Sequence, residues 1–234
     1  MSEKILTKEI AEGYLIRERS VDLDEFSTLD DEASAVLSTY SGDALSFDGL
    51  TELSETSAGN LSRYAGGLSL GSAYPIGSLG QIPVGVAECL SNFKGENLYI
   101  SLSEICDEAA ASLSKYEGCL DLSGLTTISD SAVESLSRNK KALYLDGLTM
   151  LSDYAADVFS SMKGKLFFGT WNRPGALTSI SDQAVESLSK YTGEYLSLNG
   201  LTSLSDAAAK SLSKIDEDKL WLSDEIKAQV ANYR

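Results

Sequence analysis

Two aspartates have a spacing that could support chemistry in this chain of 234 residues. Asp121 lies inside one Leu-x-Leu motif and Asp146 directly follows the next, so both would lie on adjacent strands. With Tyr144 beside them, they could form an acid/base pair or bind a cation. A solvated acidic surface explains them more simply, and we favour that interpretation.

Other aspartates are better explained by helix capping. Five recur at one position of a repeated motif, where a helix would begin: Asp107, Asp130, Asp153, Asp182 and Asp206. Negative charge at the start of a helix is stabilised by the helix dipole. Since they recur in nearly every unit, we expect them to serve the fold.

The sequence also lacks the residues on which common catalytic mechanisms depend. Histidine is absent, which excludes Ser-His-Asp and Cys-His nucleophiles and histidine-based metal sites within this chain. Cys89, Cys106 and Cys119 form no CxxC pair, so we expect reduced thiols without zinc. No P-loop, GxSxG or HExxH motif occurs. We therefore predict no catalytic residue, no metal, no cofactor and no enzymatic activity.

An internal repeat of about 23 residues must position these side chains. Its consensus, LxLxGLTxLSDxAxxxLSxxxG, is clearest from Leu120, Leu143 and Leu196. The LxL alternation predicts a strand with one buried face, and Ser-Asp followed by apolar residues three and four apart predicts a capped helix. Nine apolar pairs mark the expected strands: Val21/Leu23, Leu45/Phe47, Leu68/Leu70, Leu98/Ile100, Leu120/Leu122, Leu143/Leu145, Leu166/Phe168, Leu196/Leu198 and Leu220/Leu222.

Glycine recurs at two positions of the repeat. The glycine after the strand is expected to turn the chain with backbone angles that other residues avoid. A later glycine, such as Gly118, Gly164 or Gly193, is expected to end the helix. One unit cannot bury its own apolar side, so the units must stack, with strands on a concave face and helices on a convex face.

The GLTxLSDxAxxxLS signature resembles the leucine-rich-repeat superfamily, in particular repeat proteins found mostly in bacterial genomes. The resemblance covers about residues 20–234. It implies an α/β solenoid shaped as a horseshoe or arc, with a parallel sheet of about nine short strands, and it implies protein binding as the usual function. The usual family unit has Asn or Cys after its strand, whereas Gly124, Gly147 and Gly200 occupy that region here.

We expect three segments in the chain. Residues 1–19 form an N-terminal helical cap, with an amphipathic helix from Thr7 to Arg19; residues 20–223 form the array; and residues 224–234 form a C-terminal cap helix. The sequence has neither a long apolar stretch nor a typical secretory signal. We therefore expect a cytoplasmic protein that does not enter the membrane, unless a specialised secretion system exports it.

Two units are longer than the others. Thirty residues separate Leu70 from Ile100 and Phe168 from Leu198, and the additions form longer loops at 71–83 and 169–177. These loops contain all three prolines and Trp171. Because insertions in repeat arrays map to one edge and often bind partners, Trp171 is a candidate binding residue.

Aromatic residues are concentrated on the expected concave surface of the later strands. In an xLxLx strand the two leucines face the core and the x residues face outward. The outward residues include five aromatics in strands four to nine: Tyr99, Tyr144, Phe167, Tyr195 and Trp221. The column that follows the strands contributes Asp24, Asp48, Asp146 and Asn199. Aromatic rings beside the carboxylates of Asp121 and Asp146 are typical of a protein-binding surface.

The net charge of −16 is unfavourable for nucleic-acid binding and favours a basic partner. We therefore predict a non-catalytic scaffold that binds an unidentified protein, with a basic protein favoured, through the aromatic and acidic concave face. A glycan- or cation-binding module and a self-assembling structural repeat protein are the alternatives. Binding that depends on calcium would favour the glycan- or cation-binding hypothesis, whereas a molecular mass that rises with protein concentration would favour self-association.

Overall fold

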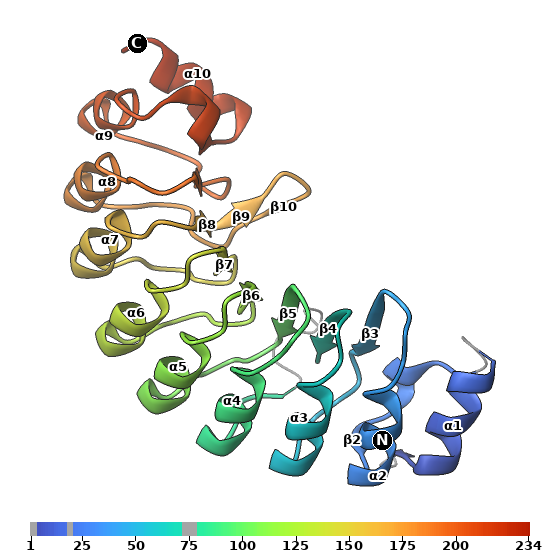
Figure 1. Ribbon diagram of the computed structural model, residues 1–234. Coiled ribbons are helices and arrows are strands. Elements are labelled where there is room, and N and C mark those ends of the chain that lie inside the picture. The colour runs from blue at the N-terminus through green and yellow to red at the C-terminus, as the bar shows by residue number, and fades with distance from the viewer. Residues whose placement is uncertain (1–3, 18–20, 72–78) are drawn as a thin grey trace. The chain divides into compact units, whose positions relative to one another are not determined.

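The computed structural model describes residues 4–17, 21–71 and 79–234, and it shows an α/β protein in which short strands alternate with short helices (Figure 1). The chain divides into two compact units, unit 1 from Met1 to Asp121 and unit 2 from Leu122 to Arg234. In the described parts of the chain, every helix is too short or too polar to cross a lipid bilayer.

Unit 1 contains a ladder of four parallel strands with helices on one side. Its ladder strands follow chain order, with Leu45, Leu68, Leu98 and Leu120 in one register row. The strands are β1 (Ile5–Leu6), β2 (Thr28–Leu29), β3 (Ala44–Phe47), β4 (Gly67–Leu70), β5 (Asn97–Ile100) and β6 (Cys119–Asp121). The helices are α1 (Lys8–Ile16), the 3-10 helix η1 (Leu23–Glu25), α2 (Asp31–Leu37), α3 (Glu55–Leu61), α4 (Val84–Leu90) and α5 (Asp107–Leu113).

Unit 2 repeats the arrangement and adds a hairpin. Its parallel strands are β7 (Ala142–Tyr144), β8 (Lys165–Phe167), β11 (Tyr195–Ser197) and β12 (Leu220–Trp221). The antiparallel hairpin consists of β9 (Gly169–Thr170) and β10 (Arg173–Pro174). The helices are α6 (Asp130–Leu136), α7 (Asp153–Ser160), α8 (Asp182–Leu188), α9 (Asp206–Leu212), the 3-10 helix η2 (Glu217–Lys219) and α10 (Asp224–Ala231).

Eight of the nine expected strands are present in the described residues, and the first is not. Leu23 is buried as expected, but it begins η1 instead of a strand. The carboxylate of Asp22 accepts a hydrogen bond from the backbone of Asp24 at 3.1 Å. This local side-chain bond closes a turn that competes with extended backbone.

The N-terminal segment differs from the expected helix over the first strand. Residues Ile5–Leu6 pair in parallel with Thr28–Leu29, and α1 packs against α2. The helix ends at Ile16, and residues 18 and 19 of the expected helix lie outside the described residues. Helix α1 therefore continues the row of repeat helices. At the other end, α10 packs against α9.

The leucines of the ladder strands form the core. Leu45, Leu68, Leu98, Leu143 and Leu166 are at most 1% exposed, as the alternation predicts. Leucine and alanine residues of the helices cover them from one side. Burial of this apolar area is the main stabilising contribution, at about 25 cal/mol per Å².

The Ser-Asp motif links successive units as well as capping helices. Ser54 Oγ accepts a hydrogen bond from Ser57 N at 2.9 Å. It also donates one at 2.5 Å to Asp31 Oδ1, which belongs to the preceding repeat. In unit 2, Ser181 likewise donates to Asp153, and Ser205 donates to Asp182 at 2.6 Å. The hydroxyl acts as acceptor within its own helix and as donor to the previous helix.

A tyrosine at the corner between helix and strand makes a second link. Tyr64 and Tyr116 donate from Oη to the carbonyl oxygens of Gly42 and Gly95, each at 2.8 Å, and Tyr191 donates to Gly164 at 2.5 Å. Each such tyrosine is followed two residues later by a glycine on which a Cβ would overlap the ring. Gly118 and Gly193 are therefore required by the close approach of the ring, and the expectation that they end the helices is wrong.

The glycine after the strand also has a different role from the one expected. Gly49, Gly147 and Gly200 do not have positive φ angles. A Cβ on any of them would overlap backbone carbonyl oxygens of the preceding repeat. Glycine stands here because successive backbones approach closely, and not because the turn needs a left-handed conformation.

We expect Gly118→Ala to destabilise the protein, because its Cβ would meet Tyr116 Oη and lie 2.6 Å from the carbonyl oxygen of Glu96. Overpacking of this kind costs about 1–3 kcal/mol. Gly13→Ala is the matched control, since nothing lies within 4 Å of the added carbon and alanine favours the helix. Urea unfolding midpoints should fall for Gly118→Ala and rise or stay level for Gly13→Ala. An unchanged midpoint for Gly118→Ala would contradict the close-approach argument.

The Ser54 link predicts a pH effect. Hydrogen bonds from Ser54 and then Ser57 lower the pKa of Asp31 below its ordinary value of 3.8. The stability that this adds is present above the ordinary pKa and is lost as pH falls through the lowered pKa. We expect Ser54→Ala to raise the pKa of Asp31 and to cost about 1 kcal/mol through the lost cap. Carboxyl NMR titration measures the pKa, and Ser38→Ala, which removes a bond to Ala35 O only, should leave it unchanged.

Candidate binding surface

Unit 2 places four of the expected aromatic residues on the strand surface that faces away from the helices. Tyr144, Phe167 and Trp221 occupy one register row on β7, β8 and β12, with Ser197 of β11 between the last two. Tyr195 precedes Ser197 by two residues and so projects from the same side of its strand. We call Tyr144, Phe167, Tyr195 and Trp221 the aromatic face.

Three rings of the aromatic face contact one another. The rings of Tyr144 and Phe167 are stacked, with centroids 4.3 Å apart and planes 5° from parallel. Tyr195 lies on the other side of Phe167, with a centroid distance of 5.7 Å and a tilt of 37°. Burial raises the pKa of Tyr195. Trp221 is 44% exposed. The three stacked rings are therefore held by their contacts with one another, while Trp221 offers exposed area beside them.

The second long unit contains an ordered β-hairpin in place of the expected loop. Strands β9 and β10 pair antiparallel, Thr170 with Arg173 and Gly169 with Pro174. Figure 1 shows this hairpin projecting from β8 on the side away from helices α7 and α8. Trp171 and Asn172 form its tip, and the Trp171 side chain is 78% exposed. We call residues 169–174 the Trp171 hairpin.

A partly buried ion pair holds the base of the Trp171 hairpin. Arg173 donates to Asp146 Oδ2 through Nη2 at 2.7 Å and through Nε at 3.0 Å, and it also reaches Ser123 Oγ at 3.0 Å. Asp146 Oδ1 accepts the backbone N–H of Gly169 at 2.9 Å. The side chain of Asp146 is 4% exposed and that of Arg173 is 32% exposed. Two charge-assisted hydrogen bonds from one guanidinium group to the same carboxylate oxygen give the pair both strength and orientation.

Strand β11 holds the other side of the hairpin. Ser197 Oγ donates to the carbonyl oxygen of Gly169 at 2.5 Å, and Asn199 Nδ2 donates to that of Thr170 at 2.6 Å. Gly169 has a φ of 123°, which an L side chain rarely adopts. The hairpin is thus held by the repeat before it and the repeat after it, both within unit 2, without any bound partner.

These contacts correct part of the expected surface. Asp146 and Asn199 were expected to face solvent, and so was Ser197 as the residue between Leu196 and Leu198. They are 5%, 9% and 1% exposed, respectively, and anchor the hairpin. Sequence reasoning missed Arg173 as their partner. An arginine inside the insert was the available signal, but only the fold brings it to Asp146, 27 residues earlier.

In unit 1 the expected site residues Tyr99 and Asp121 lie side by side on β5 and β6. Tyr99 is 44% exposed. Burial, then the charges of Asp121 and Cys119, raise the pKa of Tyr99. Within the longer loop at 71–83, residues 72–78 lie outside the described residues, whereas Leu79 and Ile82 are buried.

Charge is divided unevenly between the units. Unit 1 has 21 acidic and 7 basic residues, whereas unit 2 has 14 acidic and 12 basic residues. The strand surface of unit 2 also has exposed lysines, Lys165 and Lys219. The expected acidity therefore belongs to unit 1, and the aromatic face is close to neutral.

No cluster of three or more histidine, cysteine or acidic side chains suited to a metal ion occurs within the described ranges. No protein-family model matches the sequence, and no curated protein is significantly similar to it. The surface must therefore be interpreted from its own geometry.

We expect Arg173→Met to destabilise unit 2 by about 3 kcal/mol, because it leaves the buried carboxylate of Asp146 without its cation. Lys165→Met is the matched control, since Lys165 makes only an exposed pair with Glu194 at 3.9 Å, worth about 0–1 kcal/mol. Chemical unfolding and the fluorescence of Trp171 would report stability and hairpin order. The double variant Asp146→Asn/Arg173→Met should lose less free energy of unfolding than Arg173→Met alone. If Lys165→Met and Arg173→Met lowered the free energy of unfolding equally, the proposed role of Arg173 as the anchor would be refuted.

Proposed function

We propose that this chain is a leucine-rich-repeat solenoid that acts as a non-catalytic scaffold and binds a protein partner through the aromatic face and the Trp171 hairpin. The alternating strands and helices, the LxL core and the links between successive units support the repeat assignment. We place the interaction in the cytoplasm, as the sequence favours.

The exposed tryptophan on an anchored hairpin is the observation that carries the proposal. Trp171 offers a large apolar surface to solvent at 78% exposure. Three polar contacts, from Asp146, Ser197 and Asn199, fix the backbone beneath it, and Ser123 accepts a hydrogen bond from the side chain of Arg173. Tryptophan is enriched among residues that dominate binding energy, and a fixed loop loses little entropy when it binds.

The ring geometry favours a protein over a glycan. A sugar stacks on an exposed ring face, but Phe167 has Tyr144 on one side and Tyr195 on the other. Both sides of the Phe167 ring are therefore occupied, and a sugar cannot stack on it. Aromatic residues are enriched at protein interfaces.

The contacts of Asp146 disfavour the enzymatic and cation-binding alternatives. Both of its carboxylate oxygens already accept hydrogen bonds, one from Gly169 and the other from Arg173. A carboxylate engaged by an arginine is a poor general base and a poor cation ligand. The role of Asp146 is to position the hairpin.

The charge distribution refines the expected partner. A basic region of the partner is favoured opposite unit 1, whereas the surface opposite unit 2 is expected to be apolar and less charged. A second copy of the chain remains an alternative partner, and light scattering over a range of concentrations distinguishes it.

Affinity capture from source-cell lysate tests the proposal. We expect Trp171→Ala to lower retention of the partner by about tenfold or more, because hot-spot tryptophans contribute about 2 kcal/mol or more. Met150→Ala is the matched control, since Met150 is 77% exposed in unit 2 but lies outside the aromatic face and the hairpin. Captured proteins would be quantified at low and high salt, after circular dichroism shows that each variant is folded.

Equal retention by the wild type, Trp171→Ala and a Phe167→Ala/Trp221→Ala variant would contradict the proposed surface. Loss of retention in Met150→Ala as well would indicate nonspecific adhesion to exposed apolar groups.

A further inference from the structure

Lysines gather at one corner of unit 2, where α6 and α7 lead into β7 and β8. Lys140 and Lys141 immediately precede β7. One repeat later, Lys163 precedes β8 and Lys165 begins it. All four side chains are exposed. The two segments are adjacent, because the backbone N–H of Lys165 donates to the carbonyl oxygen of Lys141 at 2.9 Å. We call these four residues the lysine edge.

A paired exchange of residues makes room for Lys141. Elsewhere a glycine at this position follows a tyrosine by two residues, as Gly118 follows Tyr116, and a Cβ on it would overlap the ring. Asn139 stands three residues after the last leucine of its helix, as Tyr116 does. It is 1% exposed, and its Oδ1 accepts the backbone N–H of Lys141 at 2.9 Å. The smaller side chain therefore holds the corner and permits a lysine where a tyrosine permits only glycine.

Helix ends do not account for the lysine edge. A cation at the C-terminus of a helix is stabilised by the helix dipole, and this effect falls off within about one turn. It explains Arg138, which directly follows the C-cap Ser137. Lys141 and Lys165 stand four residues beyond the C-caps of their helices, within the segments that lead into the strands.

The lysine edge has little counter-charge of its own. Among the described residues of unit 2, its one ion pair joins Lys165 to Glu194 at 3.9 Å, and both side chains are exposed. Lys163 Nζ donates to a neutral group, Thr192 Oγ1, at 2.9 Å. Four like charges on adjacent segments create a positive potential that an anionic group of a partner would neutralise.

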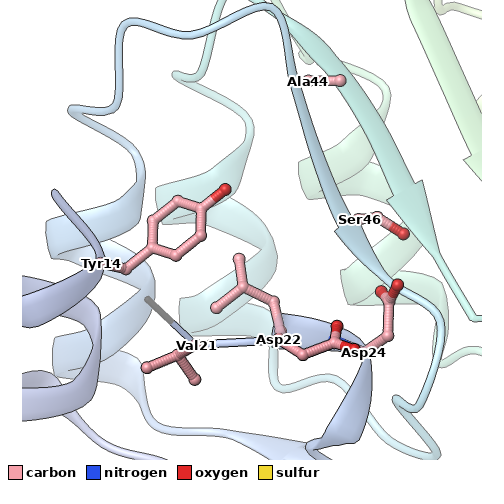
Figure 2. Close-up of a pocket in the computed structure, with 7 residues that line it drawn as sticks. Tyr14, Val21, Asp22, Asp24, Ala44 and Ser46 are labelled. Carbon is pink, nitrogen blue, oxygen red and sulfur yellow. The ribbon is translucent and has the colours of Figure 1, made fainter. Parts of the chain in front are cut away.

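Unit 1 has the opposite character. Figure 2 shows Asp22 and Asp24 along one wall of a pocket in unit 1. The corner before β5 has a glutamate as well as a lysine, Glu96 and Lys94. Acidic residues outnumber basic residues 21 to 7 in unit 1. An acidic segment of a partner is therefore repelled by unit 1 and attracted to the lysine edge.

The lysine edge borders the aromatic face. Lys165 and Phe167 stand two residues apart on β8, so their side chains project from the same side of the strand. In the register of the sheet, Lys165 lies opposite Tyr195 of β11. A ligand that pairs with Lys165 is thus positioned to contact the aromatic rings.

We propose that the lysine edge binds an acidic segment of the protein partner, whose carboxylates pair with the lysines and whose adjoining apolar side chains contact the aromatic face. This inference rests on the proposed function, because it defines the chemistry of the partner beside that face. Complementary charge fixes the register of the segment, and the rings contribute affinity. An acidic peptide fits better than a nucleic acid, because the net charge of −16 repels a long polyanion and because phosphate sites favour arginine.

Amide NMR titration of the full-length protein tests the lysine edge with three probes. The first is a capped six-residue peptide of four glutamates followed by leucine and phenylalanine. The second has glutamines in place of the glutamates, which keeps the shape and removes the charge. The third is a six-nucleotide oligothymidine. We expect the glutamate peptide to bind about tenfold more tightly than the glutamine peptide and severalfold more tightly than oligothymidine, and to shift the amide signals of Lys141, Lys165 and Phe167.

Matched variants separate the lysine edge from the other lysines of unit 2. Lys140→Gln/Lys141→Gln removes two charges and should weaken the glutamate peptide about tenfold. Lys140→Arg/Lys141→Arg keeps both charges and should retain binding within about twofold. Lys210→Gln/Lys214→Gln makes the same charge change on exposed positions at the end of α9 and should have less than about a twofold effect. Circular dichroism checks that each variant is folded.

Four results would overturn the proposal. Equal loss with the Lys210/Lys214 variant would assign binding to net charge alone. Equal affinity for the glutamate and glutamine peptides would remove the role of charge, and oligothymidine binding as tight as that of the glutamate peptide would assign the edge to nucleic acid. Self-association that Lys140→Gln/Lys141→Gln abolishes would assign the edge to the acidic surface of a second copy. The fourth result is no binding of any probe at about millimolar concentration.

The same variants in the affinity capture separate failure of the lysine edge from failure of the proposed function. If Lys140→Gln/Lys141→Gln retained the partner as the wild type does while Trp171→Ala lost it, the lysine edge would be refuted and the proposed function would stand. Loss of the partner by the lysine variant, with Trp171→Ala unaffected, would support the lysine edge and refute the proposed role of the Trp171 hairpin.

Discussion

Each leucine pair of this protein is buried only when the next strand lies one hydrogen-bonded spacing away, roughly 4.8 Å. This close approach of successive backbones imposes the remaining features of the repeat. Glycine is required where one backbone meets the previous one, as at Gly49 and Gly147. At the same short distance, a serine hydroxyl can reach the aspartate of the preceding helix, and Tyr64 can reach the carbonyl oxygen of Gly42. The polar groups thus hold the spacing that the apolar core needs.

The Trp171 hairpin makes use of the same spacing. In unit 1, Asp24 accepts the backbone N–H of Asp48, 24 residues later. In unit 2, Asp146 accepts the N–H of Gly169 in the same way, and its second oxygen holds Arg173. A link between repeats has therefore become the base of an inserted hairpin. Because the anchor belongs to a packed array, the exposed tryptophan at the tip needs little ordering before it binds.

The two units differ in the chemistry that they offer. Unit 1 is strongly acidic, whereas unit 2 combines near neutrality with aromatic area and lysines. Acidic groups steer and orient a basic segment over long distances, whereas aromatic groups contribute affinity only on contact. A partner with both a basic segment and an apolar surface would use both kinds of recognition.

The repeat can be predicted from the sequence, because each repeat must bury the same leucine pair and cap the same helix. Eight strand positions and the helix starts at Asp130, Asp153, Asp182 and Asp206 follow from that local pattern. The outward direction of Phe167 follows from alternation within one strand. Which polar residues of the surface stay exposed depends on contacts between residues far apart in the chain. The burial of Asp146 depends on Arg173, and the turn at Leu23 depends on competition between a local bond of Asp22 and pairing with β3. Contacts between residues far apart in the chain, and the balance between local and neighbouring bonds, are not encoded in a period of 23 residues.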